Sequence, residues 1–275
     1  RVGHVEAGLR THNKWQPFPE EINRRVTDLV TDLHFAPTQR ARANLLTEGV
    51  PESDVVLTGN TVIDALLDVT ARPLDCRGTA LQGLGGHDQR LILLTAHRRE
   101  SFGEPFENIC RAVAEIARAY DDVQVVYPVH PNPEVSGPAH DKLGGVPNVS
   151  LLPPLDYLSM AHLMKRSYLI LTDSGGIQEE APSLGVPVLV LRDVTERPEA
   201  VEAGAAKIVG TDYVRIVTEA RRLLDDQEEY QRMARTVNPY GDGHASERIA
   251  QALLDRPETG AASVGHPGQE IEGRD

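Results

Sequence analysis

Short apolar runs alternate with helix-patterned segments along most of this 275-residue chain, and this alternation is the strongest constraint on its fold. Residues 91–96, 123–128 and 168–172 have the length and composition of buried strands, and stretches with apolar residues at helical spacing follow them. Parallel strands need crossovers of this kind, whereas antiparallel strands can be joined by tight turns. We therefore expect an α/β fold built on parallel sheets.

The alternation falls into two series, separated by residues 71–90, which have little apolar periodicity and several glycines and prolines. We expect two Rossmann-type domains with a cleft between them. A hinge or linker region over residues 59–90 would join the first domain to a second one over residues 91–245. Residues 256–275 are polar, glycine-rich and aperiodic, and are expected to form a disordered tail.

Composition excludes several classes of partner. The net charge of −13 argues against non-specific binding to nucleic acid or to an anionic membrane, and no apolar run is long enough for a transmembrane helix. The isolated Cys76 and Cys110, and histidines without HExxH spacing, predict no metal site and no disulfide framework, and favour reduced thiols in a cytoplasmic protein. The chain opens within a strand-like pattern, without a signal peptide or initiator Met, so we expect a fragment whose beginning is missing.

Ligands of open α/β sheets bind beyond the carboxyl ends of the strands, which directs attention to the loops at 97–100, 130–132, 172–176 and 192–198. In the third loop, Ser174 is placed to cap a helix over residues 177–184 whose free N–H groups would suit a phosphate.

The two residues after Ser174 are glycines. Gly175 and Gly176 lack a Cβ, so they let a ligand approach the backbone and make a positive φ accessible. A plain serine-capped turn would have the same sequence, and both interpretations stay open.

Acidic and basic residues lie in these loops or directly after them. Glu179 and Glu180 suit the positive end of a helix, and one of them is a candidate acceptor for ribose hydroxyls. His97 and Arg98 form either an anion-facing lip or a solvated basic loop. His130 lies in a proline-flanked segment that is either a ligand contact or a rigid turn.

The remaining candidates are an arginine and three carboxylates. Arg197 is placed to face a phosphate. Glu6 follows His4 in an expected strand over residues 2–9, so alternation places both side chains on one face. Glu20 and Glu21 open an expected helix. Two carboxylates facing one cleft would serve proton abstraction and donation.

Seven segments together resemble one known family. HVEAGLR (4–10), PFPEEINR (17–24), TGNTVIDALL (58–67), TAHRRESFG (95–103), YPVHPNP (127–133), LTDSGGIQEEAPSLGVPVLVLRDVTERPEAV (171–201) and NPYGDGHAS (238–246) are similar to segments of the non-hydrolysing UDP-N-acetylglucosamine 2-epimerases. The resemblance runs from about residue 3 to about residue 254.

The resemblance implies a glycosyltransferase-B-like fold and the reversible conversion of UDP-GlcNAc to UDP-ManNAc through a 2-acetamidoglucal intermediate. It implies no metal or other cofactor and a cytoplasmic homodimer that supplies ManNAc for cell-surface polysaccharide. The matching positions imply three groups of site residues. These are Glu6, Glu20 and His97 for catalysis, then His97, Ser174, Gly175, Gly176, Glu180 and Arg197 for UDP binding, and Arg98 and His130 for an allosteric UDP-GlcNAc.

Members of this family carry about a hundred residues before HVEAGLR, and these have no counterpart here. The resemblance thus implies that residues 1–58 are the last third of an incomplete N-terminal domain, with residues 246–255 crossing back to it. We expect an exposed sheet edge and an inactive or poorly folded fragment. The alternatives are a hydrolysing epimerase, a glycosyltransferase that uses a UDP-sugar, and a non-catalytic sensor of nucleotide sugars.

Overall fold

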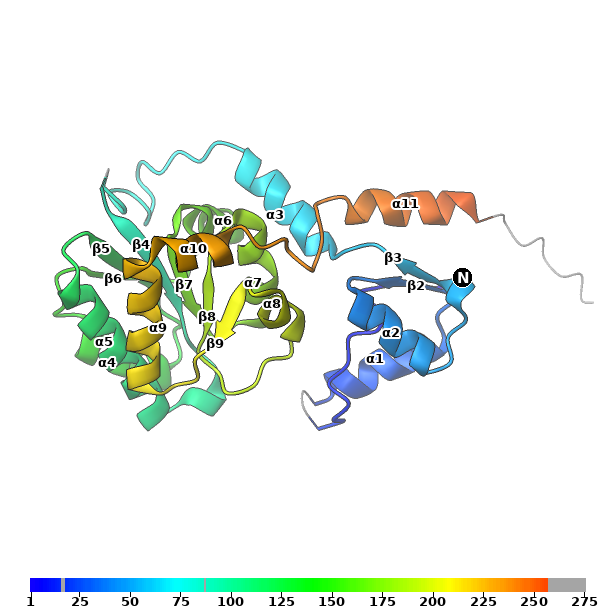
Figure 1. Ribbon diagram of the computed structural model, residues 1–275, viewed down its shortest axis with the longest axis horizontal. Coiled ribbons are helices and arrows are strands. Elements are labelled where there is room, and N and C mark those ends of the chain that lie inside the picture. Colours follow the sequence, from blue (N-terminus) through cyan, green and yellow to red (C-terminus); the bar gives the residue numbers. More distant parts are fainter. Residues whose placement is uncertain (16–17, 87, 257–275) are drawn as a thin grey trace, which may run out of the picture.

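The computed structural model describes residues 1–15, 18–86 and 88–256, which form two unequal lobes (Figure 1). Each lobe is built on a parallel sheet, three-stranded in the smaller lobe and six-stranded in the larger one, so the prediction of a parallel α/β fold is confirmed. The expected tail beyond residue 256 lies outside the described residues.

The smaller lobe holds the first series of elements. In chain order they are β1 (Gly3–Val5), α1 (Glu20–Leu29), β2 (Leu33–Ala36), α2 (Gln39–Thr47), a 3-10 turn (Glu52–Asp54) and β3 (Val55–Leu57). β2 lies between β1 and β3.

The second series and its flanking helices follow. They are α3 (Thr61–Ala71), β4 (Arg90–Thr95), α4 (Glu104–Ala119), β5 (Val123–Pro128), α5 (Pro133–Leu143), β6 (Val149–Leu152), α6 (Tyr157–Arg166), β7 (Leu169–Thr172), α7 (Gly175–Glu180), β8 (Val188–Val190), α8 (Pro198–Ala203), β9 (Ala206–Ile208), α9 (Tyr213–Asp225), α10 (Gln227–Ala234) and α11 (Ala245–Asp255). Two 3-10 turns, at Arg99–Ser101 and Ala181–Leu184, complete the series.

The strand order of the larger sheet is β6-β5-β4-β7-β8-β9. The chain starts in the middle at β4, moves outward to β6, then returns to the other side of β4 at β7. This is the order of a doubly wound sheet, and it creates a switch point between β4 and β7 where loops leave in opposite directions. At that point Thr95 pairs with Thr172, and their hydroxyls are 2.6 Å apart.

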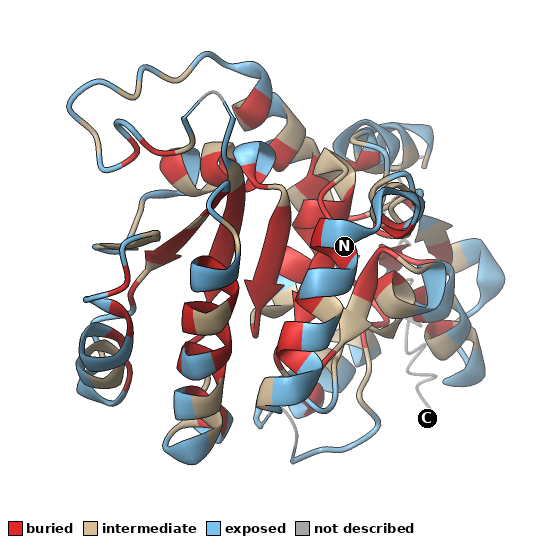
Figure 2. Cartoon of the chain, turned by 60° about the vertical axis from the view of Figure 1, so that its left-hand side comes forward, coloured by how far each residue is buried: buried red, intermediate tan, exposed pale blue. Residues whose placement is uncertain are grey.

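Both faces of the larger sheet are covered by helices. Ile92 and Leu94 of β4 pack into the core on the α4, α5 and α9 side, whereas Leu91 and Leu93 pack into the core on the α3 and α6 side. Figure 2 shows central strands of the sheet buried along their length and helices buried on one side only. A strand buried on both faces reads as a continuous apolar run, which is why the sequence revealed these strands clearly.

The stretch expected as a linker, residues 59–90, contributes to the larger lobe instead. Ile63 and Leu66 of α3 are fully buried in its core, and Leu81 is buried there too. The chain passes between the lobes at Gly59, and it passes back near Gly241. These glycines lie against each other, since a Cβ on Gly59 would come within 3.2 Å of the Gly241 Cα.

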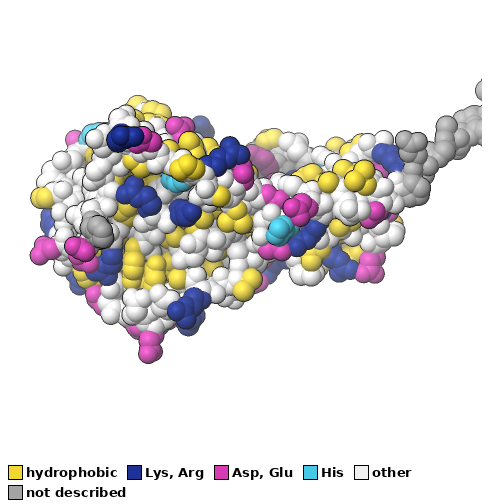
Figure 3. All heavy atoms as spheres, turned by 90° about the horizontal axis from the view of Figure 1, so that it is seen from above, with side chains coloured by type: hydrophobic (Ala, Val, Ile, Leu, Met, Phe, Trp, Pro, Cys, Tyr) yellow, Lys and Arg dark blue, Asp and Glu magenta, His cyan; other side chains and the backbone are white. Residues whose placement is uncertain are grey.

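The last helix, α11, returns to the smaller lobe. Arg248 donates to the carbonyl oxygen of Thr58, and Arg256 donates to those of Asp32 and Ser53. β1 lies at the edge of its sheet. Several large apolar side chains of the smaller lobe and of α11 are exposed, among them Val2, Val5, Ile22, Val26, Leu29, Val30, Leu57, Leu253 and Leu254. Figure 3 shows apolar surface on this part of the molecule.

No helix in the described part of the chain is both long and apolar enough to span a bilayer.

Candidate functional site

The loops that follow β4, β5 and β7 meet at the switch point. The Asp173 carboxylate, fully buried after β7, accepts hydrogen bonds from the backbone N–H groups of His97 (2.6 Å) and Arg98 (2.7 Å) after β4. The His97 ring stacks on the His130 ring, with 5.3 Å between centroids and 10° between planes. The structure thus brings together three of the four loops that the strand-end rule selected.

The Ser174 turn lies at the start of α7. Ser174 is the N-cap residue, as expected, but its hydroxyl makes no capping hydrogen bond, and α7 begins at Gly175 rather than at residue 177. Neither Gly175 nor Gly176 uses the positive φ that glycine makes accessible. A Cβ on Gly175 would have the Arg197 guanidinium carbon 4.0 Å away. The glycines therefore leave room over the helix start without conformational strain.

Gln178 links the Ser174 turn to the fourth loop. Its side chain is fully buried; its amide donates to the Ser174 carbonyl oxygen (3.0 Å) and accepts from the Thr195 hydroxyl (2.5 Å). The Thr195 hydroxyl also accepts the backbone N–H of Arg197. Gln178 could not be singled out from the sequence, because it stands in a short run with the polar residues Glu179 and Glu180 and only the fold shows that it is buried.

The two neighbouring glutamates have different surroundings. Glu179 is buried, pairs with the Arg197 guanidinium, and accepts a 2.6 Å hydrogen bond from the Asn60 side chain at the start of α3. Glu180 accepts a 3.2 Å hydrogen bond from the Tyr157 hydroxyl. Burial raises the pKa of Glu180 to about 7; the Tyr157 hydrogen bond opposes this shift and the Glu179 charge adds to it.

Glu6 lies in the turn after β1 and not within the strand. β1 ends at Val5, and Glu6 has a φ of 64°, so the expectation that Glu6 and His4 share a strand face is wrong. The charge of Glu6 acts on Glu179 in the larger lobe. The pKa of Glu179 is raised above its usual value, mainly because the carboxyl group is buried; the nearby charge of Glu6 adds to this rise, and Arg197 opposes it.

Glu20 and Glu21 open α1, as expected, but in different environments. Glu20 is exposed, and no hydrogen bond or ion pair of the described residues joins it to Glu6. Glu21 is fully buried and accepts the backbone N–H groups of Thr11 (3.0 Å) and His12 (3.1 Å). Glu21 therefore holds the loop that enters the cleft, and convergence of Glu6 with Glu20 stays a prediction.

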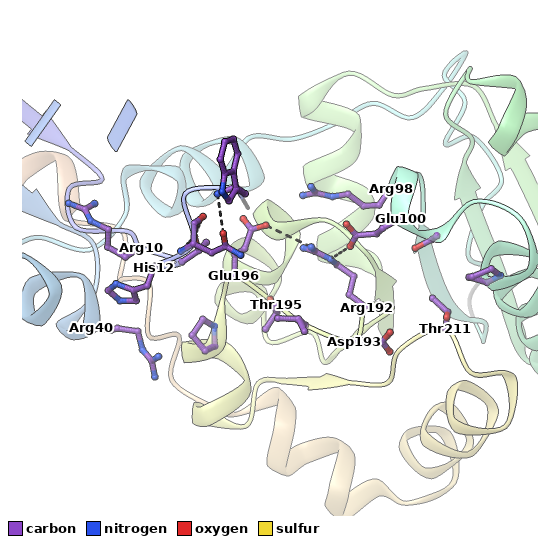
Figure 4. Close-up of a pocket in the computed structure, with 17 residues that line it drawn as sticks. Arg10, His12, Arg40, Arg98, Glu100, Arg192, Asp193, Thr195, Glu196 and Thr211 are labelled. Atoms are coloured by element: carbon purple, nitrogen blue, oxygen red, sulfur yellow. Dashed lines mark hydrogen bonds and ion pairs between the residues drawn. The ribbon is translucent and has the colours of Figure 1, made fainter. Parts of the chain in front are cut away.

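A cleft of about 780 Å³ opens between the lobes beside these loops. Figure 4 shows Arg10, His12 and Arg40 on one side of it, and Arg98 and Arg192 on the other. Of the sequence-predicted site residues, Arg98 lines the cleft, whereas Ser174, Glu180, His97 and Glu6 lie outside its lining.

The cleft arginines differ in their partners. Arg192 donates to Glu100 (2.6 Å), and Arg10 pairs with Asp28 and Glu48. The Arg98 guanidinium forms no ion pair within the described part of the chain, so it remains available to an anion. Arg192 belongs to the fourth loop that the strand-end rule selected, whereas Arg10 and Arg40 could not be identified from the sequence, because their proximity to the cleft depends on how the lobes meet.

Across residues 1–15, 18–86 and 88–256, no group of three or more His, Cys, Asp and Glu side chains is arranged to hold a metal ion.

Comparison with known proteins places this geometry in a family. The family model for UDP-N-acetylglucosamine 2-epimerase matches residues 1–254. The chain is 54% identical over 257 residues to the UDP-N-acetylglucosamine 2-epimerase of Escherichia coli K12, covering 92% of this chain and 68% of that protein. It is 55% identical over 263 residues to the Yersinia pestis protein of the same name, covering 94% and 70%.

Solved structures agree with this. The UDP-GlcNAc 2-epimerase from Neisseria meningitidis, bound to UDP-GlcNAc, matches with a TM-score of 0.83 and 47% identity, covering 93% of this chain and 70% of that one. The Methanocaldococcus jannaschii enzyme in complex with UDP-GlcNAc and UDP matches with a TM-score of 0.73 and 36% identity, covering 92% and 68%. The fold is therefore glycosyltransferase-B-like, and the chain belongs to the UDP-N-acetylglucosamine 2-epimerase family.

Proposed function

We propose that the protein containing this chain is an isomerase that interconverts UDP-GlcNAc and UDP-ManNAc. The observation that carries the proposal is the switch-point site, where the loops of His97 and Ser174 are hydrogen-bonded together through Asp173. A relative of the same fold and 47% identity is bound to UDP-GlcNAc. This chain spans about two thirds of the length of the relatives that it matches, so the activity is proposed for the whole protein.

The UDP moiety would bind at the start of α7. The Ser174 hydroxyl and the N–H groups at Gly175 and Gly176 offer donors to a diphosphate, and nearby Arg197 and His97 can add positive charge. Arg197 is already paired with Glu179, so its charge is partly neutralised. Glu180, which already accepts a hydrogen bond from the Tyr157 hydroxyl, would accept further hydrogen bonds from the ribose hydroxyls.

The chemistry at C2 would use carboxylates of the smaller lobe. One of Glu6 and Glu20 removes the C2 proton, and its electron pair forms the C1–C2 double bond as the C1–O bond to UDP breaks. UDP then leaves with that bonding pair, and 2-acetamidoglucal remains. Re-addition of UDP to C1, with a proton delivered to the other face of C2 by the second carboxylate, gives the epimer. His97 would stabilise the charge that develops on the departing phosphate.

The proposal extends to regulation and cellular role. Arg98 faces the cleft without an ion pair and His130 stacks on His97, so both can contact a second UDP-GlcNAc that acts as an allosteric activator. The whole protein would act as a cytoplasmic homodimer whose product supplies ManNAc units for cell-surface polysaccharide.

The decisive assay incubates the full-length protein with UDP-GlcNAc in D₂O, without an acceptor, and follows the sugar protons by NMR. UDP-ManNAc carrying deuterium at C2 is the expected product. Free ManNAc with UDP would identify a hydrolysing epimerase, and reaction only after an acceptor is added would identify a glycosyltransferase. Binding without exchange of the C2 proton would identify a sensor.

We predict that UDP-GlcNAc binding depends on the ionisation of Glu180. Ribose hydroxyls donate best to an ionised carboxylate, and burial raises the pKa of Glu180 to about 7. Affinity should therefore tighten as the pH rises through about 7, by up to about tenfold per pH unit below the pKa. Calorimetric titrations at several pH values should show this dependence in the wild type and lose it in Glu180→Gln. A wild-type profile that matches the variant would contradict the ribose assignment.

A further inference from the structure

Asp173 is a fully buried acid between the end of β7 and Ser174, where it joins the loops of His97 and Ser174, and none of the catalytic steps proposed above gives it a role. Burying a carboxylate is unfavourable unless hydrogen bonds or opposite charges compensate for its lost hydration. The two oxygens of Asp173 are compensated very differently.

Oδ2 of Asp173 accepts two short backbone hydrogen bonds, 2.6 Å from the His97 nitrogen and 2.7 Å from the Arg98 nitrogen. These bonds fix the backbone of the loop after β4. Oδ1 is buried and has no hydrogen-bond partner among the described residues, although Nδ1 of the His97 ring is 3.5 Å away. A small rotation of the imidazole would convert this approach into a hydrogen bond.

The His97 ring is restrained on its other side. It stacks nearly parallel to the His130 ring, and Nδ1 of His130 accepts the backbone N–H of Asn132 at 3.1 Å. That bond places the proton of neutral His130 on Nε2 and restrains its ring. The charged or titratable groups around His97 are thus Asp173 after β7, His130 after β5, and Arg98 beside it in the chain. Of these groups, Asp173 offers an acceptor to Nδ1, at 3.5 Å.

We infer that Asp173 is a positioning residue that acts through His97: its Oδ1 accepts the Nδ1 proton, so that Nε2 is the ring nitrogen presented to the ligand. A carboxylate in this position selects the tautomer and the orientation of the ring, as an acid does behind a catalytic histidine. For the reaction this inference rests on the proposed function, because Nε2, which has no proton in this tautomer, would take one up and donate it to a UDP phosphate oxygen. The tautomer itself does not depend on that function.

The variant that separates this role from a purely structural one is Asp173→Asn. An asparagine oxygen can replace Oδ2 and keep the two backbone hydrogen bonds, whereas the amide nitrogen replaces Oδ1 and changes an acceptor into a donor. Long-range ¹⁵N–¹H NMR of the histidine rings in the full-length protein reports the tautomer, and His97→Gln assigns the signal. Asp141→Asn, an exposed change of the same kind on α5, is the matched control.

Neutral His97 should carry its proton on Nδ1 in the wild type and in Asp141→Asn. In Asp173→Asn the proton should move to Nε2, because the amide nitrogen now donates to Nδ1. An Nε2–H tautomer in the wild type would overturn the inference even if the variant did not fold. An unchanged tautomer in a folded Asp173→Asn would leave Asp173 as a backbone anchor only.

Kinetics give an independent readout. If Asp173 acts through His97, Asp173→Asn should lower kcat more than it raises KM. In the double variant, Asp173→Asn should lower kcat little further than His97→Gln alone does. If the effects of the two changes on kcat were fully additive, the two residues would not be coupled. If neither the wild type nor the variants show epimerase turnover but His97 shows the expected tautomers, the proposed function is refuted and the inference about Asp173 and the His97 tautomer still holds.

Discussion

Glu20→Gln is expected to reduce kcat by about 10²- to 10⁴-fold, the usual contribution of a positioned general acid or base. Glu20 is an exposed residue at the start of α1, and its side chain makes no hydrogen bond or ion pair within the described part of the chain. Removing its charge therefore breaks no native contact, and both stability and UDP affinity should stay close to the wild-type values. Steady-state turnover of UDP-GlcNAc and calorimetric UDP binding measure the two effects separately.

Two other changes, one at the next residue and one in the larger lobe, act as controls for Glu20→Gln. Glu21→Gln alters a buried carboxylate that accepts the N–H groups of Thr11 and His12, so it should cost about 1–3 kcal/mol of unfolding free energy. Ser174→Ala should weaken UDP binding more than it lowers kcat, because it removes a donor at the proposed diphosphate site. Full turnover by Glu20→Gln would show that its catalytic assignment is wrong.

Glu179→Gln is expected to lower the free energy of unfolding by about 3–5 kcal/mol, because it removes the closer of the two carboxylates that pair with the buried Arg197 guanidinium and leaves only the more distant Glu196. The same carboxylate accepts the Asn60 side chain at 2.6 Å, and Asn60 lies where the chain enters the larger lobe. The loss should therefore appear as a cooperative destabilisation in urea, with the midpoint shifted to lower concentration.

The matched control for Glu179→Gln is Glu202→Gln. Glu202 pairs with Arg40 of the smaller lobe at 2.5 Å, but both side chains are largely exposed. Exposed pairs of this kind contribute about 0.2–1 kcal/mol, so this change should scarcely move the urea midpoint. Equal small effects from both variants would mean that the Glu179–Arg197 pair adds no more stability than a surface pair.

Much of the larger lobe could be predicted from the sequence, because its strands are buried on both faces and therefore appear as plain apolar runs. α5 was missed, since Pro133, Gly137 and Pro138 resemble a chain break. Its helix persists because Pro133 occupies the first turn, where no N–H is needed, and because Val135, Ala139 and Leu143 form one buried stripe. Packing on the sheet outweighs the local helix-breaking residues.

The site was predictable to the extent that strand ends define it. The loops of His97, His130 and Ser174 could be selected because the doubly wound order brings the ends of β4, β5 and β7 together. The residues that link these loops, Asp173 and Gln178, could not be selected from the sequence, because they act through partners in other loops. The turn geometry at Glu6 was missed for a related reason, since alternation continues in the sequence after the hydrogen-bonded strand has ended.

The return of α11 to the smaller lobe also determines the order in which the chain can complete its fold. Arg256 bonds to the Asp32 carbonyl across 224 residues of sequence, and Arg248 bonds to that of Thr58 across 190. Loop closure of this length is slow compared with the local pairing of neighbouring strands and helices. During synthesis from the N-terminus, the smaller lobe must therefore wait for nearly the whole larger lobe before it receives these last contacts.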